Sequence, residues 1–582
     1  MIMGVFEFVL AASPIVFVLV GILAFKKPAM KVAPLALLWT MVLAFTYFNV
    51  TGLAFKENVA AYDALLWKGI KEGGKIVAMV FGAFVILNTL KRTGAIEDVK
   101  NTVARISGND RRVQLIVVGL MVPIFLEGAA GAGAPAAIAA PFLVALGFDP
   151  VVAIAVALLG DATPCSWGGA GLTTISGGAA LVDAGVSTAA LNSAMVGRIH
   201  MFGVMVIPFI MVAIAFGRKG FKNIIPYLCY AGVTTGTTMF FLSNFVGPEV
   251  TSMGTGLISM LFSVVYVKLV PIKTPEEFRY KAPEKVDRKF SAWRAMSPYL
   301  YMLILLPVVR YGVPAFVENG FALMCTFGYI VWVDVVIFLC AVLGAITLGM
   351  RAEDFGGAFT GVTGGSVTVA HQGKEGKAPV YEQVSAAQAR AMEGHTFFSD
   401  ASACVRNFPG AVRSALRRSE FSSACKSTVG SVFPVLVTMG SLLVLAYIMQ
   451  AKTTGMMNLI ASDISNMAGI FYPAAAVFIG TMGSFITGTG LGSNIMFAGM
   501  HTQAATALGM NPITVFAGQN AGASLGNLIC PNNTVAACAT VGQVGNESKV
   551  MRKTLPACGI LVALYMALSM VYTLVVFPNF GM

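Results

Sequence analysis

Long apolar runs separated by short polar stretches dominate the chain. Runs of about 20 apolar residues, the length needed to cross a bilayer as a helix, include Gly4–Phe25, Val32–Phe55, His200–Phe216, Ile224–Gly247, Leu323–Met350 and Pro556–Val576. A membrane barrel would instead show segments of about ten residues with alternating hydrophobicity. The pattern therefore predicts an all-α polytopic membrane protein. Because no cleavage site follows the first run, we expect it to be a retained span rather than a signal peptide.

Two segments far apart in the chain repeat one pattern. Each has a Gly-rich apolar stretch, at 125–146 and 485–508, followed by Leu-Gly-x-Asp/Asn-Pro ending at Pro150 or Pro512. Ten residues past each Pro, Gly160 or Gly522 opens a polar stretch that we expect to break the helix. Paired, Gly-interrupted hydrophobic segments point to the binding site of a transporter. The sequence therefore predicts an internal duplication with a solute site between its copies.

Composition and charge narrow the expected partners. Hydrophobic residues make up 57% of the chain and charged residues 11%, and the net charge is +12. In a soluble chain this charge would suggest nucleic acid, but membrane proteins retain basic loops on the cytoplasmic side. We therefore expect the lipid bilayer of the bacterial inner membrane as the partner, with multiple spans, and not nucleic acid. The nine Cys lack ligand spacing, so no metal, disulfide or cofactor is expected.

The basic stretches set the predicted topology. They are Lys26–Lys31, Lys91–Arg112, Arg218–Lys222, Lys273–Arg294, Arg351–Lys426 and Lys549–Lys553. Placing them all inside requires about twelve spans plus two segments that enter and return on one side. These two segments, Val113–Leu146 and Ile470–Leu508, are predicted to be re-entrant helical hairpins. Their unwound backbone must be buried in protein or line a cavity.

The predicted domain is one integral membrane unit, residues 1–582, with repeat 1 at about 75–217 and repeat 2 at about 428–577. Lys91-Arg92-Thr93-Gly94 matches Lys452-Thr453-Thr454-Gly455, and the span count puts the first inside and the second outside. The repeats are therefore expected to be inverted, as alternating access requires.

Two hydrophilic loops, about 272–296 and 351–427, are expected in the cytoplasm. We interpret the second as an amphipathic arm that lies on the membrane or on the transport core. The alternative is a regulatory ligand site.

Two acidic residues of the first repeat are candidates for ion coupling. Glu127 lies in the first hairpin, and an ionisable group at membrane depth normally faces a cavity and marks an ion or proton path. The alternative is a structural carboxylate bonded to the hairpin amides. Asp161 opens the first break, where Pro164 removes an amide and frees carbonyl groups. Asp161 could handle a proton or cation, or it could cap the second half-helix.

Neutral polar residues complete the predicted site. Glycines let backbone amides approach a ligand, and half-helix N-termini attract anions, so Ser493 and Asn494 suit a carboxylate. Thr and Ser could instead bond back within a helix. The predicted substrate contacts are Gly128, Gly131, Thr163, Ser166, Thr487, Thr489, Ser493, Asn494, Asn520, Asn532 and Asn533. Gln519, Ser524 and Asn527 share the second break with them.

Four basic residues or histidines lie within or beside the apolar runs. Arg310 could pair with a carboxylate, but its place near the outer end favours snorkelling. Arg198 and His200 stand where a run starts, so an interfacial position is expected for both. His501 could carry a proton, and the alternative is a packed, hydrogen-bonded histidine.

The two repeated segments resemble the lactate permease family of bacterial proton-coupled 2-hydroxy-acid transporters. The resemblance rests on Glu127-Gly-Ala-Ala-Gly-Ala-Gly-Ala-Pro135, on Thr487-Gly-x-x-x-x-Ser493-Asn494 and on Gly526-Asn-Leu-Ile-Cys-Pro531-Asn-Asn-x-x-Ala536. It implies the paired-hairpin plan of the ion-transporter superfamily, with a scaffold and a core that moves like an elevator, often in a homodimer. Glu127 matches the hairpin acid of the family.

This chain departs from the family pattern at three positions. Ala132 stands where an aromatic residue is usual, Gly490 where many members have an acid, and Asp161 where Asn is expected. The acid has therefore moved from one half of the expected site to the other.

The sequence predicts a secondary transporter, not an enzyme, that imports a small 2-hydroxy monocarboxylate such as L-lactate, D-lactate or glycolate with H⁺. Glu127 or Asp161 would carry the proton. The alternative is a sodium-coupled carboxylate carrier, because unwound carbonyls also suit Na⁺. An enzyme would need a nucleophile–base set, which Ser166 lacks in the sequence. A channel is a third class, although two opposed hairpins suit a carrier better.

Overall fold

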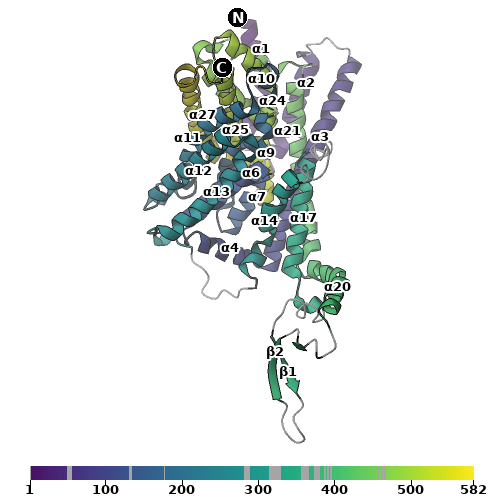
Figure 1. Cartoon of the computed structure of the whole chain (residues 1–582). Helices are drawn as coiled ribbons and strands as arrows, with labels where there is room; N and C mark the ends of the chain where they lie inside the picture. Colours follow the sequence, from purple (N-terminus) through teal and green to yellow (C-terminus); the bar gives the residue numbers. More distant parts are fainter. Residues whose placement is uncertain are drawn as a thin grey trace.

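The apolar runs fold as helices, because a helix satisfies every backbone hydrogen bond within its own segment. The computed structural model describes residues 2–25, 27–48, 55–129, 134–175, 177–280, 289–312, 329–355, 366–371, 380–385, 388–389, 392, 396–451, 453–456, 459–460, 463 and 467–581. Both chain ends lie at the same end of the helical body (Figure 1). The all-α prediction is confirmed for this body.

Five helical segments of the described residues are long and apolar enough to cross a membrane. They are Ala29–Thr46, Ala189–Phe221, Pro248–Leu269, Gly469–Thr487 and Glu547–Val576. The twelve spans expected from the charge pattern therefore stay a prediction.

One group of helices lies outside the two Gly-rich repeated segments. It comprises α1 (Ile2–Leu19), α2 (Ala29–Thr46), α3 (Phe55–Thr93), α4 (Ala95–Ile106), α14 (Ala292–Pro307), α17 (Tyr329–Gly349), α20 (Phe397–Arg418) and α21 (Phe421–Gln450). The structure differs from the prediction at two places. The apolar run Val32–Phe55 is helical only as far as Thr46, where α2 ends. The basic stretch 91–112, predicted as a loop, contains the helix α4.

Helices α3 and α21 pack side by side and run in opposite directions. Near the end of α3, the Asn88 Nδ2 atom donates to Thr428 Oγ1 near the start of α21, at 3.1 Å. Further back on α3, the Lys68 Nζ atom lies 4.4 Å from the centre of the Tyr447 ring, late in α21. Gly94, after α3, and Gly455, after α21, therefore lie at opposite ends of this helix pair.

The first repeated segment contains α5 (Arg111–Ile116), η2 (Val117–Met121), α6 (Val122–Ala129), α7 (Ala134–Ala145), α8 (Pro150–Gly160), η3 (Pro164–Trp167), α9 (Gly168–Ile175), α10 (Ala179–Asp183) and α11 (Ala189–Phe216). The second contains η8 (Gly469–Phe471), α23 (Tyr472–Thr487), α24 (Gly490–Ala507), α25 (Pro512–Ile529), α26 (Pro531–Thr540), α27 (Glu547–Val571) and η9 (Tyr572–Val576).

The Leu-Gly-x-Asp/Asn-Pro motif forms the same helix junction in both copies. The glycines have positive φ, 85° at Gly147 and 65° at Gly509, which ends α7 and follows α24. The next polar side chain then caps the following helix: Asp149 accepts from the Val152 amide at 3.0 Å, and Asn511 accepts from the Ile513 amide at 2.9 Å. The predicted duplication therefore has a local structural counterpart.

The second break differs from the prediction. Helix α25 does not break at Gly522 but continues to Ile529, and the break falls at Cys530, before Pro531. The glycines of α25 instead allow close packing on α23. A Cβ atom at Gly522 would collide with the Val477 carbonyl and one at Gly526 with the Thr481 carbonyl, so the two backbones touch. The Thr481 hydroxyl also donates to the Gly522 carbonyl at 3.1 Å.

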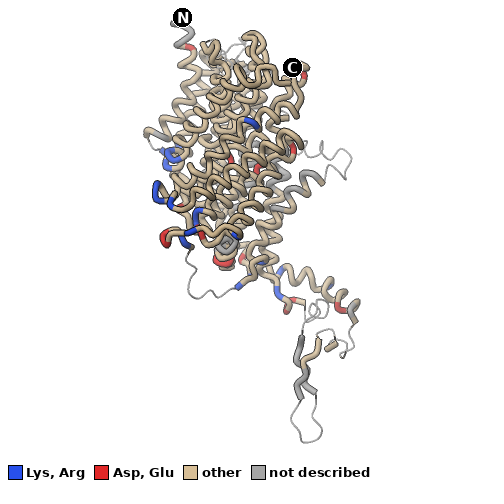
Figure 2. Tube along the Cα trace, turned by 60° about the vertical axis from the view of Figure 1, so that its left-hand side comes forward, with Lys and Arg blue, Asp and Glu red and all other residues tan. Residues whose placement is uncertain are grey.

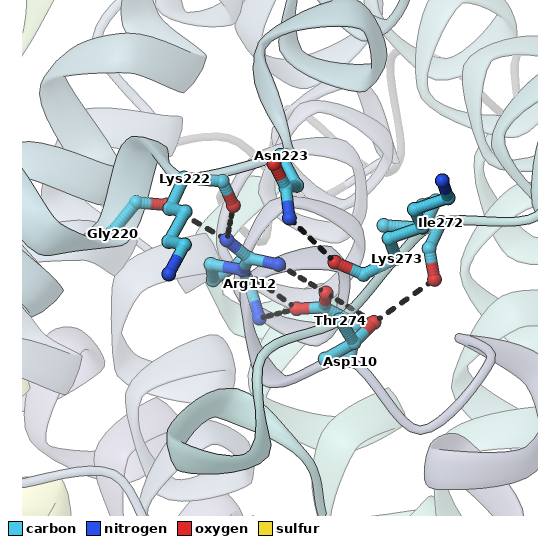
Figure 3. Close-up of polar contacts among 8 residues, drawn as sticks. All are labelled: Asp110, Arg112, Gly220, Lys222, Asn223, Ile272, Lys273 and Thr274. Carbon is cyan, nitrogen blue, oxygen red and sulfur yellow. Dashed lines mark hydrogen bonds and ion pairs between the residues drawn. The ribbon is translucent and has the colours of Figure 1, made fainter.

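A buried ion pair lies at the start of α5 (Figure 3). The Arg112 Nη2 atom lies 2.6 Å from Asp110 Oδ2, and both side chains are almost fully buried. Arg112 also donates to the carbonyls of Gly220 and Lys222, at 3.0 and 2.6 Å. The Thr274 hydroxyl donates to Asp110 at 2.8 Å. The pair thereby joins the loop after α11 to the loop that follows α13 (Pro248–Leu269).

The remaining elements are α12 (Ile225–Phe245), η4 (Gly217–Phe221), η5 (Glu276–Phe278), η6 (Val308–Gly312), η7 (Ala352–Phe355), η1 (Val20–Ala24), β1 (Ser366–His371) and β2 (Val380–Ser385). The strands β1 and β2 pair antiparallel, with Ser366 opposite Ser385, and project away from the helical body (Figure 1). They lie in the predicted 351–427 loop and depart from the all-α prediction. Lys and Arg are concentrated in the part of the molecule away from the chain ends (Figure 2).

Candidate functional site

Two buried carboxyl groups face each other in the middle of the chain's first repeat. Glu127 lies on α6 and Asp161 directly follows α8, and each side chain is about 1% exposed. The two groups are close enough for their charges to interact. Within the described part of the chain, Glu127 Oε2 and both Asp161 carboxylate oxygens have no hydrogen-bond partner. The sequence predicted each acid separately, and the structure brings them together.

The packing around this pair is tight. Gly168, the first residue of α9, lies against Glu127, and a Cβ atom added there would collide with Glu127 Oε1. The Asp161 carboxylate caps neither half-helix, because neither of its oxygens accepts a backbone amide. The capping alternative is therefore wrong. The nearby Thr163 hydroxyl is also buried and unpaired among the described residues.

The first break contacts the second repeat directly. The Ser166 hydroxyl lies 2.7 Å from the Ser524 hydroxyl and 2.7 Å from His200 Nε2. The Asn520 amide donates to Thr174 Oγ1 at 2.9 Å, and the Asn527 amide lies 2.7 Å from Cys165 Sγ. Polar residues of the two copies, far apart in the sequence, thus form one buried centre.

The tip of the second hairpin is a tight turn. Gly488 has a φ of 76°, and Thr489 caps α24 by accepting from the Gly492 amide at 2.9 Å. The Thr487 hydroxyl donates to the Thr489 carbonyl at 2.9 Å. These two threonines therefore stabilise the turn rather than bonding back within a helix, and their predicted contact with substrate stays a prediction. Gly488 packs on the Asn532 side chain, so the tip of this hairpin lies against the start of α26.

Ser493 and Asn494 are fully buried and bonded within the protein. The Ser493 hydroxyl donates to the Gly480 carbonyl at 3.0 Å and receives Gln519 Nε2 at 3.0 Å. The Asn494 amide donates to the Thr173 carbonyl at 3.1 Å. Their predicted role in holding substrate stays a prediction.

Two side-chain amides of α25 and α26 have unused acceptors. Asn520 Oδ1 and Asn532 Oδ1 are buried without a partner among the described residues, whereas Asn533 Nδ2 donates to the Asn527 carbonyl at 3.4 Å. A small cavity of about 20 Å³, lined by Phe485, Pro531 and Asn532 among others, adjoins this point. It has room for about one water molecule.

Gly128 and Gly131 were both predicted to contact substrate, and the structure describes only the first of them. Gly128 packs directly on the backbone of Met253 in α13, which leaves no room for a side chain. Gly131 and Ala132 lie outside the described residues, as does Lys452. Arg310 lies in η6, and its side chain is likewise outside the description.

His200 and His501 are core residues. His200 is fully buried, with Nδ1 2.8 Å from the Tyr565 hydroxyl, so its predicted interfacial position is wrong. Helix α11 begins at Ala189, which places His200 well inside it. His501 lies between the Tyr472 hydroxyl (2.7 Å) and Gln519 Oε1 (2.9 Å), which matches the packed alternative. Arg198 is half-buried.

Arg198 lies over aromatic rings near the end of the chain. Its guanidinium carbon is 4.7 Å from the Phe580 ring centre and 5.7 Å from that of Phe240.

Several members of the polar centre were not predicted: Cys165, Thr173, Thr174, Ser484 and Tyr565. Thr173 and Thr174, which follow the Gly-rich stretch 168–171, could have been predicted as members of this centre, because they are polar residues in an otherwise apolar segment.

Apolar spans around a buried polar centre define the chain as a helical membrane transport protein. It belongs to the L-lactate permease family, whose model matches residues 7–347 and 410–577. This membership indicates a transporter rather than an enzyme.

Relatives align over almost the whole chain. The L-lactate permeases of Bacillus subtilis and of Escherichia coli K12 are each 25% identical, over 94% of this chain and 92% of theirs. The glycolate permease of Escherichia coli K12 is 25% identical over 94% of this chain and 91% of its own. Among solved structures, the YdaH transporter of Alcanivorax borkumensis aligns over 93% of this chain and 98% of that chain, with 13% identity and a TM-score of 0.35.

Proposed function

We propose that the protein imports a small 2-hydroxy monocarboxylate, such as L-lactate, D-lactate or glycolate, by proton symport across the bacterial inner membrane. The relatives named as L-lactate and glycolate permeases support the substrate class. The observation that carries the proton assignment is the contact between the buried carboxyl groups of Glu127 and Asp161.

This contact suits a transported proton for an electrostatic reason. Neither carboxyl group forms an ion pair with Lys or Arg among the described residues, so two negative charges there would be unscreened. A proton shared between the groups removes one charge and supplies the missing hydrogen bond. Losing the proton restores the repulsion. The pair therefore has two states that differ strongly in their attraction for positive charge.

The substrate carboxylate fits the opposite half of the centre. The start of α24 and the start of α26 meet where Gly488 packs on Asn532. Helix N-termini carry free amides and a positive partial charge, which attract an anion. Thr163 Oγ1 and Asn532 Oδ1 have free acceptors that a substrate hydroxyl can satisfy. The acids and the anion site then lie on different repeats.

Alternating access is part of the proposal. The antiparallel α3 and α21 place Gly94 and Gly455 at opposite ends, which supports inverted repeats. The twelve spans, re-entrant hairpins, elevator movement and homodimer remain parts of this proposal.

Transport by purified protein in proteoliposomes tests the proposal. Under an inward proton gradient, wild type should accumulate labelled L-lactate, whereas Glu127→Gln should lose accumulation but keep lactate–lactate counterflow. Glu249→Gln, which changes an acid outside the polar centre, is the matched control and should accumulate normally. Unchanged accumulation by Glu127→Gln would falsify the proton assignment.

The sodium-coupled alternative receives no support from the family or from the names of the relatives. Replacing Na⁺ by choline at fixed pH should therefore leave uptake unchanged. Uptake that stops in choline would replace H⁺ by Na⁺ in the proposal.

A further inference from the structure

An open, cationic cavity lies away from the polar centre, where the ends of four helical segments meet. Its volume is about 460 Å³, and it is lined by basic residues from the end of α3, the start of α14, and the ends of α17 and α20. These residues are Arg92, Lys289, Arg294, Arg351 and Arg418. They come from segments about 330 residues apart, so no single sequence motif reveals the cluster.

Two of the guanidinium groups are held rigidly at the end of α17. Arg294 donates through Nε to the Thr347 carbonyl at 2.7 Å and also reaches the Met350 carbonyl. Arg418 donates to the Gly349 carbonyl at 2.8 Å. These bonds satisfy carbonyls that a helix end leaves free, and they fix both cations at the cavity wall.

The cavity has more positive charge than its carboxylates balance. Arg92 pairs with Glu420 at 2.8 Å, and Arg418 pairs with Asp354. Lys289 and Arg351 form no salt bridge among the described residues, and Asp354, which already pairs with Arg418, is the carboxylate whose charge attracts Arg351. Arg351 is also close enough to Arg294 for their charges to repel. An anion in the cavity would remove this repulsion and screen the unpaired cations.

The surroundings of the cavity suit a membrane interface. Trp293, beside Arg294, is 77% exposed, and tryptophan is typical of the headgroup level. Further along α20, toward its N-terminus, Phe398 is 83% and Val405 75% exposed, so the helix that ends at Arg418 also carries uncovered apolar residues. Basic pockets between helices on the cytoplasmic side are known to bind phosphate headgroups.

We propose that this cavity binds a phosphate-bearing anion, supplied either by the headgroup of an anionic lipid or by a soluble phosphate compound. Arg294 and Arg418 would form the fixed wall, and Lys289 and Arg351 would close on the phosphate oxygens. Arginine and lysine both form short charge-assisted hydrogen bonds with phosphate. The site is separate from the transport centre and does not depend on the proposed substrate or coupling ion.

Binding to the full-length protein in a neutral detergent tests the proposal. The probes are dihexanoyl phosphatidylglycerol, zwitterionic dihexanoyl phosphatidylcholine and inorganic phosphate, and the readout is the dissociation constant from calorimetry. The test variant is Lys289→Gln/Arg351→Gln, which leaves the helix-capping Arg294 and Arg418 in place. The control is Arg218→Gln/Lys219→Gln, which removes two exposed cations from another loop.

We expect wild type and the control to bind an anionic probe at least about tenfold more tightly than the test variant, because each lost cation weakens binding to phosphate groups. Binding of phosphatidylglycerol identifies a lipid site, and binding of inorganic phosphate alone identifies a soluble ligand. Measurable and equal affinity for phosphatidylglycerol and phosphatidylcholine would overturn the proposal. So would the absence of anion binding to wild type, or equal weakening in both double variants.

Discussion

The hydroxyl oxygens of Ser166 and Ser524 lie 2.7 Å apart, and this contact joins the first break to the second repeat. His200 and Tyr565 extend it into a buried chain of four polar side chains. The chain holds the two copies in a defined relative position. A substrate that bound Ser166 would have to compete with these bonds, which favours Thr163 as the hydroxyl of the first break that remains free.

Replacing Ser166 should destabilise the protein. In Ser166→Ala, His200 loses one of its two partners while staying buried, which costs about 1–3 kcal/mol. The melting temperature of purified protein measures this loss. Ser259→Ala is a matched control, because the Ser259 hydroxyl is buried without a partner and its removal should cost nothing comparable. Equal melting temperatures of the two variants would contradict the prediction.

A methyl group at Gly168 should impair transport without changing any charge. The Cβ atom of Gly168→Ala collides with Glu127 Oε1 and should push the carboxyl group away from Asp161. We expect the initial rate of proton-driven L-lactate uptake to fall by about tenfold or more, since misplacement by about 1 Å is costly at a functional site. Gly559→Ala in α27 meets no atom within 4 Å and should transport normally. Normal uptake by Gly168→Ala would argue against a role for the carboxyl contact.

The ion pair at the start of α5 should be important for stability. Asp110→Asn leaves the Arg112 guanidinium buried without its charge partner, which typically costs about 3–5 kcal/mol. A lower melting temperature is the expected result. Arg279→Gln removes one member of an exposed pair with Glu276 and should cost less than about 1 kcal/mol. A similar loss in both variants would show that the burial of Arg112 adds nothing.

The pair at the end of α20 should give a defined acid dependence. The hydrogen bond from the Arg418 guanidinium lowers the pKa of Asp354 from the usual 3.8 to about 2. The folded state therefore binds the proton less readily than the unfolded state. The stabilisation is complete above about pH 4 and is lost as the pH falls through 2. The melting-temperature difference between wild type and Asp354→Asn should shrink over this range, and a constant difference would refute the assignment.

Local signals in the sequence predicted local structure well. The Leu-Gly-x-Asp/Asn-Pro motif places a residue with free φ, a capping side chain and a Pro at the first helical position, and both copies form the expected junction. Pro164 and Pro531 mark both real breaks, because proline removes an amide from the helix. Strand β1 starts with alternating polar and apolar residues, Ser366-Val-Thr-Val, but β2 has no such alternation, so the pair gives only a weak signal in the sequence.

Contacts between distant segments could not be predicted in this way. Gly522 offers the same local signal as Gly160, but α23 packs on it and the helix continues. His200 stands at the edge of an apolar run, yet its partner Tyr565 is 365 residues away. The acids Glu127 and Asp161 were each identified from their cost in an apolar segment. Their mutual contact follows only from how α6 packs beside the end of α8.

The backbone contact between α23 and α25 limits how the second repeat can move. With glycine at 480 and 522, no side chains separate the two helices at this contact. The helices therefore cannot slide past each other by changes of side-chain rotamer. The arm of the hairpin and the helix that carries Asn520 and Asn527 must therefore shift as a single piece. If the second hairpin opens and closes during transport, α23 must then move together with α25 and its side-chain amides. A covalent cross-link between α23 and α25 should therefore leave the transport rate unchanged.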